Sequence, residues 1–236
     1  MKLGIMQPYF LPYIGYFQLL ASVDKFIIYD NIKYTKKGWI NRNRMLQNGS
    51  DVIFSLPLKK DSDSLDVVER ELAGDFDRTK LLNQFRCAYR SAPQFELTYQ
   101  VLERIVRHDD ANLFRYIYHS IVQLTEHLDI KMEIRISSEI AIDHELKGQD
   151  KVLALCKAAG ADTYINTIGG IELYSKADFR VQGLDLKFIK TRPFEYAQFG
   201  GTFVPWLSIV DVLMFNPMQV VRERIYSGFD LLGATA

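Results

Sequence analysis

The sequence predicts an α/β fold with a parallel-sheet core, a β-hairpin and a helical insertion. Three observations indicate it: a strand, helix and strand pattern over residues 2–30, an Asn-Gly turn between strand-like runs, and helical periodicity over about 76–130. A strand, a helix and a parallel strand form a βαβ unit, and repeated units build a Rossmann-like sheet. With 236 residues, 48% of them hydrophobic, the chain can bury one good core. We therefore expect a single domain covering residues 1–236.

The first βαβ unit occupies the N-terminal segment. Residues 2–6 form a short apolar run suited to a central strand, and the Gln-Pro pair that follows ends it because proline has no amide hydrogen to donate. Apolar residues then recur at helical spacing over 12–23, before a second apolar run at 26–29. Ligands of such units usually lie beyond the carboxyl ends of the strands, near the N-terminus of the first helix.

The middle of the chain predicts the hairpin and the insertion. Residues 40–58 read as a β-hairpin around Asn48-Gly49, a strong two-residue turn signal. The charged stretch 59–72 indicates a solvated loop that could act as a mobile flap. Apolar residues at helical spacing then predict about three helices over 76–128, which we expect to cover part of the sheet.

A second βαβ unit follows the insertion. Alternation over 132–136 predicts a strand, 149–159 a helix that ends at Gly160, and 162–166 another strand. The remaining elements that we expect are a strand at 184–189 and helices at 209–215 and 217–226.

Composition excludes several classes of protein. Lys plus Arg and Asp plus Glu both total 29, which lacks the basic excess of a nonspecific nucleic-acid binder. The two cysteines show no zinc-type spacing and the four histidines no HExxH motif, so we expect no metal site. No stretch approaches the roughly 18 apolar residues of a membrane span, and no signal peptide is evident. We expect a cytoplasmic protein without membrane insertion, and a homo-oligomer remains open.

Polar residues stand where the first βαβ unit would place a nucleotide site. We expect the crevice to be lined by Gln7, Tyr13, Gly15, Tyr16, Asp30 and Asn31. The tyrosine hydroxyls could be directed toward a ligand, and the glycine between them permits close backbone approach. The competing interpretation is that aromatic residues at this spacing belong to the core.

A basic loop follows the second strand of the unit. Four cations fall within nine positions next to Trp39, and the loop leaves from the same sheet edge as the crevice. Such a set can clamp a diphosphate through charge-assisted hydrogen bonds. The candidate ligand-binding residues of this loop are Lys36, Lys37, Asn41, Arg42 and Arg44. The competing interpretation is a solvated hairpin.

Later candidates carry weaker signals. Gly169-Gly170 is a turn that could approach a phosphate, although paired glycines are common in ordinary turns. Gln198 is expected to be exposed on a loop and available to a ligand, whereas Ser208 and Asp211 form a helix-capping pair with a structural role. Neither a GxSxG motif nor a P-loop is present, so nucleophilic hydrolysis has no positive support.

Several ordered strings resemble the WbqC-like family over nearly the whole chain. These are MQPYFLPYIGYFQL, DKFIIYD, KKGWINRNR, ADTYINTIGGIELY and FVPWLSIVD. The resemblance implies an association with bacterial O-antigen and other surface polysaccharides. It also suggests a nucleotide-linked sugar, particularly an amino sugar, as the substrate.

A more distant resemblance concerns the nucleotidylyltransferase superfamily, which includes pantothenate synthetase. Tyr13-Ile14-Gly15-Tyr16 stands where that superfamily has a helix-opening HxGH motif. There the histidines stabilise phosphate charge, whereas tyrosine donates a hydrogen bond but carries no positive charge at neutral pH. The departure puts adenylyl transfer in doubt, although cations of the basic loop could supply the charge and ATP remains a candidate cofactor.

Together these features predict a transferase or an ATP-dependent amide-forming ligase. It would transfer an acyl or aminoacyl group from a small acyl or amino-acid donor to the amine of a nucleotide-linked sugar. Asp30 would take up the proton, Gln7 and Tyr13 would orient the carbonyl, and Arg42 with its neighbours would hold the diphosphate. The alternative is a noncatalytic sugar-nucleotide or glycan binding protein. A single-stranded nucleic-acid binder is a third reading, which the neutral charge disfavours, and we expect no nucleic-acid partner.

Overall fold

The computed structural model describes residues 1–233 and is built around a six-stranded sheet of order β5-β2-β1-β6-β7-β8. Neighbouring strands are parallel except β8, which runs antiparallel to β7. The strands are β1 (Lys2–Met6), β2 (Lys25–Ile28), β5 (Glu133–Ile136), β6 (Thr163–Thr167), β7 (Asp185–Thr191) and β8 (Phe229–Gly233). The predicted α/β class with a Rossmann-like sheet is confirmed.

Strand order creates a switch point at the centre of the sheet. From β1 the chain first builds outward through β2 and β5, then crosses back and adds β6 and β7 on the other side of β1. The connections that leave β1 and β6 therefore diverge beyond their carboxyl ends. In open α/β sheets this divergence leaves a crevice in which ligands bind.

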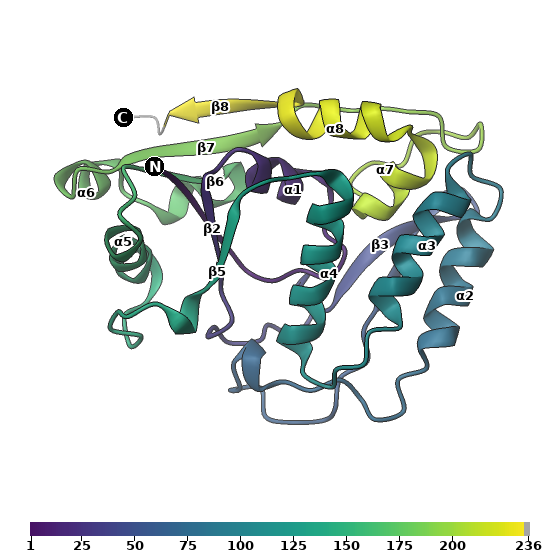
Figure 1. Cartoon of the computed structure of the whole chain (residues 1–236), viewed down its shortest axis with the longest axis horizontal. Coiled ribbons are helices and arrows are strands. Elements are labelled where there is room, and N and C mark those ends of the chain that lie inside the picture. Colours follow the sequence, from purple (N-terminus) through teal and green to yellow (C-terminus); the bar gives the residue numbers. More distant parts are fainter. Residues whose placement is uncertain (234–236) are drawn as a thin grey trace.

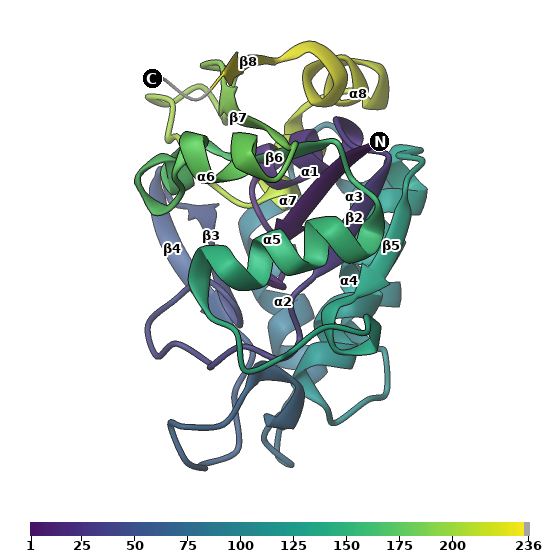
Figure 2. The ribbon, with the colours of Figure 1, turned by 90° about the vertical axis from the view of Figure 1, so that its left-hand side faces the viewer.

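Helices cover both faces of the sheet. On one face lie α5 (Gly148–Ala159) and α6 (Lys176–Val181), and α5 crosses in front of β1 and β2 in Figure 2. Their core includes Leu3, Ile5 and Leu155. On the other face α1 (Ile14–Ala21) and α8 (Met218–Ser227) pack against each other in a larger core.

The three predicted helices of the insertion are present. They are α2 (Arg78–Tyr89), α3 (Phe95–Val106) and α4 (Leu113–Leu128), and they stand together on the right of Figure 1. Their apolar stripes join the larger core, which also holds α7 (Ile209–Phe215). The insertion thereby extends the core of one sheet face.

The predicted hairpin is also present, as β3 (Arg42–Gln47) and β4 (Ser50–Ser55). Its turn residues adopt positive φ, 51° at Asn48 and 77° at Gly49, the conformation that this residue pair adopts readily. The stretch 59–72, expected as a solvated flap, is held to itself by the buried Arg70, whose guanidinium donates to the carbonyl oxygens of Ser62 and Lys59. It is anchored to the segment after β2 by the Val67 amide, which donates to the Ile32 carbonyl oxygen over 2.8 Å.

Five short elements of the described residues were not predicted: the three-residue 3-10 helices Val67–Glu69 and Ser137–Glu139, and three longer ones, which are α6, β8 and the 3-10 helix at Ile168–Leu173. Each of the three longer elements is five or six residues long. Segments of that length carry too little periodicity to be recognised, and β8 depends on pairing with β7 across the sheet.

Within residues 1–233, no helix has both the length and the apolar character needed to cross a bilayer.

Candidate functional site

A cleft of about 940 Å³ opens beyond the carboxyl ends of β1, β2 and β6. The segments that follow these strands line it together with the start of α5 and part of the 59–72 stretch. This is the switch point of the sheet, where the topology alone predicts a ligand. Gln7, Asn31, Gly169 and Gly170, all predicted from the sequence, lie in its wall.

The turn after β1 is held by tyrosine hydroxyls. Tyr9 donates to Oε1 of Gln7 over 3.3 Å, and Tyr16 donates to the Gln7 carbonyl oxygen over 3.1 Å. Tyr16 is buried, and burial raises its pKa well above the ordinary value. Tyr16 therefore fixes the turn from its buried side. The side-chain NH₂ group of Gln7 is the donor that this residue can offer to a ligand.

Asp30, the predicted base, lies behind the cleft wall. Its side chain is only 2% exposed. Its carboxylate accepts hydrogen bonds from the Ser137 hydroxyl at 2.7 Å and from the hydroxyl and amide of Ser138 at 2.5 and 2.9 Å. The same Ser137 hydroxyl lies 2.7 Å from Oδ1 of Asn31. Asp30 thus ties the end of β2 to the end of β5 and positions Asn31.

His144 contributes a fixed ring to the cleft. Its Nδ1 lies 2.9 Å from Nδ2 of Asn31, and its Nε2 lies 3.0 Å from the Ile140 carbonyl oxygen. A carbonyl oxygen only accepts, so this pattern assigns the proton to Nε2 and leaves Nδ1 to accept from Asn31. The arrangement fixes the orientation of the imidazole ring in the cleft wall.

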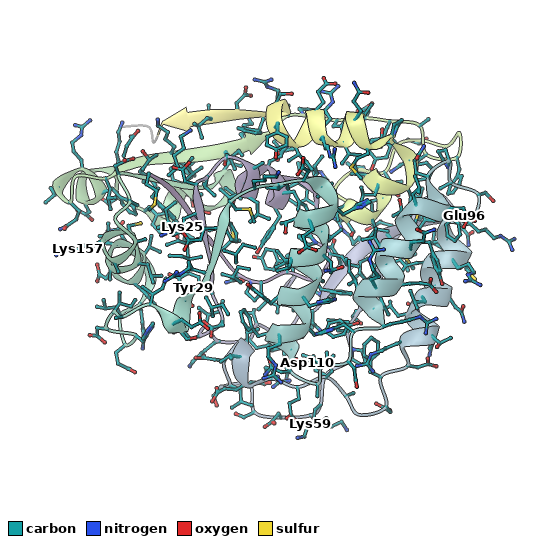
Figure 3. The ribbon with its side chains drawn as sticks, viewed as in Figure 1. Lys25, Tyr29, Lys59, Glu96, Asp110 and Lys157 are labelled. Carbon is teal, nitrogen blue, oxygen red and sulfur yellow. The ribbon has the colours of Figure 1, made fainter. Side chains whose placement is uncertain are left out.

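The start of α5 makes one side of the cleft electropositive. Its N-cap Lys147 provides no side-chain cap, so the first amides of the helix have no side-chain acceptor there. Lys151 is 8% exposed, and its ammonium lies 3.3 Å from the Asn31 carbonyl oxygen and 5.8 Å from the ring centre of Tyr29. Figure 3 marks Tyr29 beside α5 and Lys157 on the outer side of the helix. Amides and ammonium together favour an anion.

Asp66 brings a carboxylate into the same cleft. It lies in the 59–72 stretch, which pairs with the segment after β2 through an isolated bridge between Lys33 and Asp66. Burial, and secondarily the neighbouring Glu69, raises the pKa of Asp66 above its ordinary 3.8. A half-buried carboxylate in an open cleft can accept a proton from a ligand.

The glycine turn after β6 forms the opposite wall. A Cβ at Gly170 would lie 3.0 Å from Nδ2 of Asn166, whereas a Cβ at Gly169 would meet open space. Gly170 is therefore needed for packing. Gly169 is the position at which a ligand can approach the backbone.

Three of the four cations of the basic loop, Lys36, Arg42 and Arg44, are engaged within the loop or with its surroundings. The Lys36 ammonium pairs with Asp63 at 2.7 Å, and the Arg42 guanidinium donates to the carbonyl oxygens of Gly38, at 2.8 Å, and Lys37. None of Lys36, Lys37 and Arg42 lines the cleft. The structure does not bring these three cations to the switch point.

The other predicted loop residues differ in placement. Asn41 is structural, since its Nδ2 donates to the Leu56 carbonyl and its Oδ1 accepts from Tyr34, both over 2.8 Å. Arg44 pairs with Asp51 at 3.3 Å and lines a second hollow next to the cleft.

Tyr13 lines that second hollow, not the cleft. Its hydroxyl lies 3.0 Å from Oγ1 of Thr191, and burial raises its pKa although this hydrogen bond lowers it. Its ring folds over Gly15, where an added Cβ would overlap the Tyr13 hydroxyl. Gly15 makes room for Tyr13 instead of for a ligand.

Gln198 was expected to be exposed, and this expectation is wrong, because its side chain is 3% exposed. Its Nε2 donates over 2.7 Å to Oδ2 of Asp211, which also accepts from the Tyr196 hydroxyl at 2.6 Å. The Tyr89 hydroxyl donates to Oδ1 of Asp211 over 2.9 Å. Gln198 thus belongs to a buried network beneath α7. Ser208 caps α7 as predicted, whereas the side chain of Asp211, its predicted partner in the cap, belongs to this network instead.

Sequence reasoning missed Lys33, Asp66, His144, Lys147 and Lys151. One signal could have found the two α5 lysines: this helix opens the second βαβ unit, so its first turn faces the same sheet edge as Gln7. The other three lie in loops without periodicity. Within residues 1–233, no three His, Cys, Asp or Glu side chains are grouped so that they could hold a metal ion.

Comparison with known proteins agrees with the strings in the sequence. The profile described as the WbqC-like protein family matches residues 7–223. The chain belongs to this family. The matched range covers every cleft segment after β1. A relative from Mycobacterium tuberculosis (strain ATCC 25618 / H37Rv), named "Uncharacterized protein Rv1507c", is 30% identical over 225 residues, which cover 91% of this chain and 93% of that protein. No solved structure matches this WbqC-like chain.

Proposed function

We propose that this WbqC-like protein is a cytoplasmic enzyme of bacterial surface-polysaccharide biosynthesis that transfers an acyl or aminoacyl group to the amine of a nucleotide-linked amino sugar. The observation that carries the proposal is the polar cleft at the switch point, between the start of α5 and the glycine turn after β6. Nucleotides bind α/β sheets at this position.

The diphosphate of the ligand would bind between α5 and Gly169. The uncapped amides of α5 and the ammonium groups of Lys147 and Lys151 supply positive charge, and the open approach at Gly169 lets phosphate oxygens come close to the backbone. The cleft volume of about 940 Å³ lies within the range of small-molecule sites and accommodates a ligand of sugar-nucleotide size.

The chemistry requires a neutral amine and a polarised carbonyl. The ammonium of the sugar first loses a proton, and we assign its acceptance to Asp66, which is the half-buried one of the two carboxylates that line the cleft, the other being the exposed Glu145. The amine nitrogen then attacks the carbonyl carbon of the donor, a C–N bond forms, and the bond to the donor's leaving group breaks. The proton that the new amide nitrogen loses departs with that leaving group. The Gln7 NH₂ group donates to the carbonyl oxygen as negative charge develops there. A free carboxylic acid would first need activation by ATP.

Asp66 replaces Asp30 as the base in this scheme. The carboxylate of Asp30 accepts its hydrogen bonds from the two serines after β5, and Asp30 does not line the cleft. The Tyr13 hydroxyl is likewise paired with Thr191 in the neighbouring hollow, so Gln7 alone retains its predicted role.

Noncatalytic binding of a sugar nucleotide is the second candidate. The engaged states of Asp30 and His144 favour it, because two titratable groups near the cleft have their hydrogen-bonding atoms committed to the protein. This candidate predicts affinity without turnover.

Binding is tested first, by a thermal-shift screen of the purified protein against UDP-, GDP- and dTDP-linked amino sugars and ATP, followed by calorimetry. Lys151→Met should weaken binding of the stabilising sugar nucleotide at least about 10-fold, since one charge-assisted contact is worth about 1.4 kcal/mol or more. Lys157→Met, at the exposed end of the same helix, is the matched control. Stabilisation by none of these ligands, or equal losses in both variants, would contradict the proposed site.

Turnover is tested next by mass spectrometry of the sugar nucleotide incubated with enzyme and acyl or aminoacyl donors. Asp66→Asn should abolish the mass gain while retaining binding. Binding without a mass gain from any donor would favour the noncatalytic candidate.

A further inference from the structure

Both tryptophans of the chain, Trp39 and Trp206, line the second hollow, whose volume is about 390 Å³. They come from segments 167 positions apart and are 42% and 62% exposed, among the most exposed large hydrophobic side chains of the described residues. Tyr13 and Arg44 also line this space, which we call the aromatic hollow. Exposed aromatic rings of this kind offer surfaces on which a flat ligand can stack.

The aromatic hollow adjoins the cleft at the switch point. Met6, Tyr9, Thr167 and Gly169 line both spaces. A single ligand can therefore extend from one into the other past the glycine turn.

Trp39 is held by the basic loop. The guanidinium carbons of Arg42 and Arg44 lie 5.4 and 5.5 Å from its ring centre, within the range of cation–π attraction. Arg42 is itself fixed by the backbone carbonyls of Lys37 and Gly38. These contacts give the loop cations a supporting role that does not require direct contact with a diphosphate.

Trp206 is held in a strained conformation. Its φ of 61° lies in the left-handed region, which a bulky residue rarely adopts. The Arg44 guanidinium donates to its carbonyl oxygen over 3.2 Å, the Ser208 amide donates to the Arg44 carbonyl over 2.9 Å, and the Tyr13 ring centre lies 5.9 Å away. An exposed ring does not contribute to the hydrophobic core, so packing of the ring does not explain this strained backbone. Strained backbone conformations are concentrated at functional sites.

We infer that the aromatic hollow binds the nucleobase of the nucleotide-linked sugar, with the diphosphate at the Gly169 junction and the sugar in the cleft. This inference rests on the proposed function. The orientation follows from chemistry: the amine must lie near a titratable group, and Asp66, His144 and Lys151 all line the cleft and not the hollow. The hollow offers aromatic faces, on which bases stack whatever their identity, and a guanidinium that can donate to a base carbonyl.

Intrinsic fluorescence tests this assignment directly, because all tryptophan emission comes from the hollow. Titration with UDP, GDP and dTDP should change the emission saturably for at least one of them, whereas glucosamine 1-phosphate, which has no base, should leave it unchanged. Trp206→Ala should weaken that diphosphate at least 10-fold in calorimetry. Trp39→Phe and Trp206→Phe, which keep an aromatic ring, assign the signal to each position.

Phe199→Ala is the matched control. Phe199 is also an exposed aromatic residue with positive φ, 51% exposed with φ 48°, but it lies outside both spaces, and its loss should leave affinity unchanged. A sugar nucleotide that binds in calorimetry without changing tryptophan emission, and with equal affinity for Trp206→Ala, would overturn the base assignment and leave the proposed function intact. An emission change with glucosamine 1-phosphate would assign the hollow to the sugar instead. Failure of every sugar nucleotide to bind in calorimetry would overturn both.

Discussion

The Asp211 network and the cleft both gather polar side chains from distant segments, yet they use them differently. In the network, both carboxylate oxygens of Asp211 accept hydrogen bonds from buried or half-buried donors. In the cleft, α5 begins without a side-chain cap, and Lys33 and Lys147 are exposed.

We infer from this difference that the network contributes to stability and the cleft to ligand binding. Polar groups that are buried with partners stabilise the fold, and they cost free energy once a partner is lost. Polar groups at the mouth of a cleft are solvated and can exchange water for a ligand. Substitutions in the network should therefore change unfolding, and those in the cleft should change affinity.

Asp211→Ala should produce the largest effect. It would leave the Tyr89, Tyr196 and Gln198 donors without their acceptor, so the free energy of unfolding should fall by about 3 kcal/mol or more. Asp211→Asn retains one acceptor oxygen and should cost clearly less. Urea denaturation measures both. A loss below about 1 kcal/mol for the alanine variant would remove the distinction between the two regions.

Asp30→Ala should lower the free energy of unfolding by about 2 kcal/mol, since it leaves the Ser138 hydroxyl and amide without their acceptor, whereas the Ser137 hydroxyl still has Oδ1 of Asn31. Asp66→Asn, in the cleft, should change it by less than about 0.5 kcal/mol. Chemical denaturation of the two variants compares a buried, hydrogen-bonded carboxylate with a carboxylate of the cleft. Full stability of Asp30→Ala together with loss of turnover would return the base role to Asp30.

A pair of glycines sharpens the comparison further. Gly15→Ala forces the Tyr13 hydroxyl away from Thr191 and should destabilise the protein by about 1–2 kcal/mol. Gly169→Ala meets open space and should leave stability within about 0.5 kcal/mol while weakening sugar-nucleotide binding. Thermal unfolding and calorimetry on both variants check this, and unchanged affinity for Gly169→Ala would place the diphosphate elsewhere.

The smallest effect concerns pH. His108 and His119 stack with ring centres 3.8 Å apart, and burial, then the neighbouring His119, lowers the pKa of His108 below 6.5. The unfolded state therefore binds more protons as the pH falls below 6.5, and stability decreases until the folded-state pKa is passed. His119→Gln should show a smaller loss of urea midpoint between pH 7.5 and pH 5.5 than the unmodified protein. An identical loss would mean that the stacked histidines do not contribute to the pH dependence of stability.

Local sequence signals determined most of the elements. A short apolar run located β1, alternation located β5, helical spacing located the insertion helices, and Asn48-Gly49 located the hairpin turn. Such signals depend on residues a few positions apart, which share one face of a strand or helix. They also placed Gln7, Asn31 and Gly169 at the switch point, because each directly follows a strand or lies within the turn after one.

Only the tertiary structure decided which polar side chains remain free. The partner of Asp30 is Ser137, 107 positions away, and Arg44 holds Trp206 across 162 positions. Such pairings depend on how distant segments meet, which no local pattern records. For the same reason Asp30 accepts, and Gln198 donates, hydrogen bonds inside the protein. The basic loop supports Trp39, and the positive charge of the cleft comes from the start of α5.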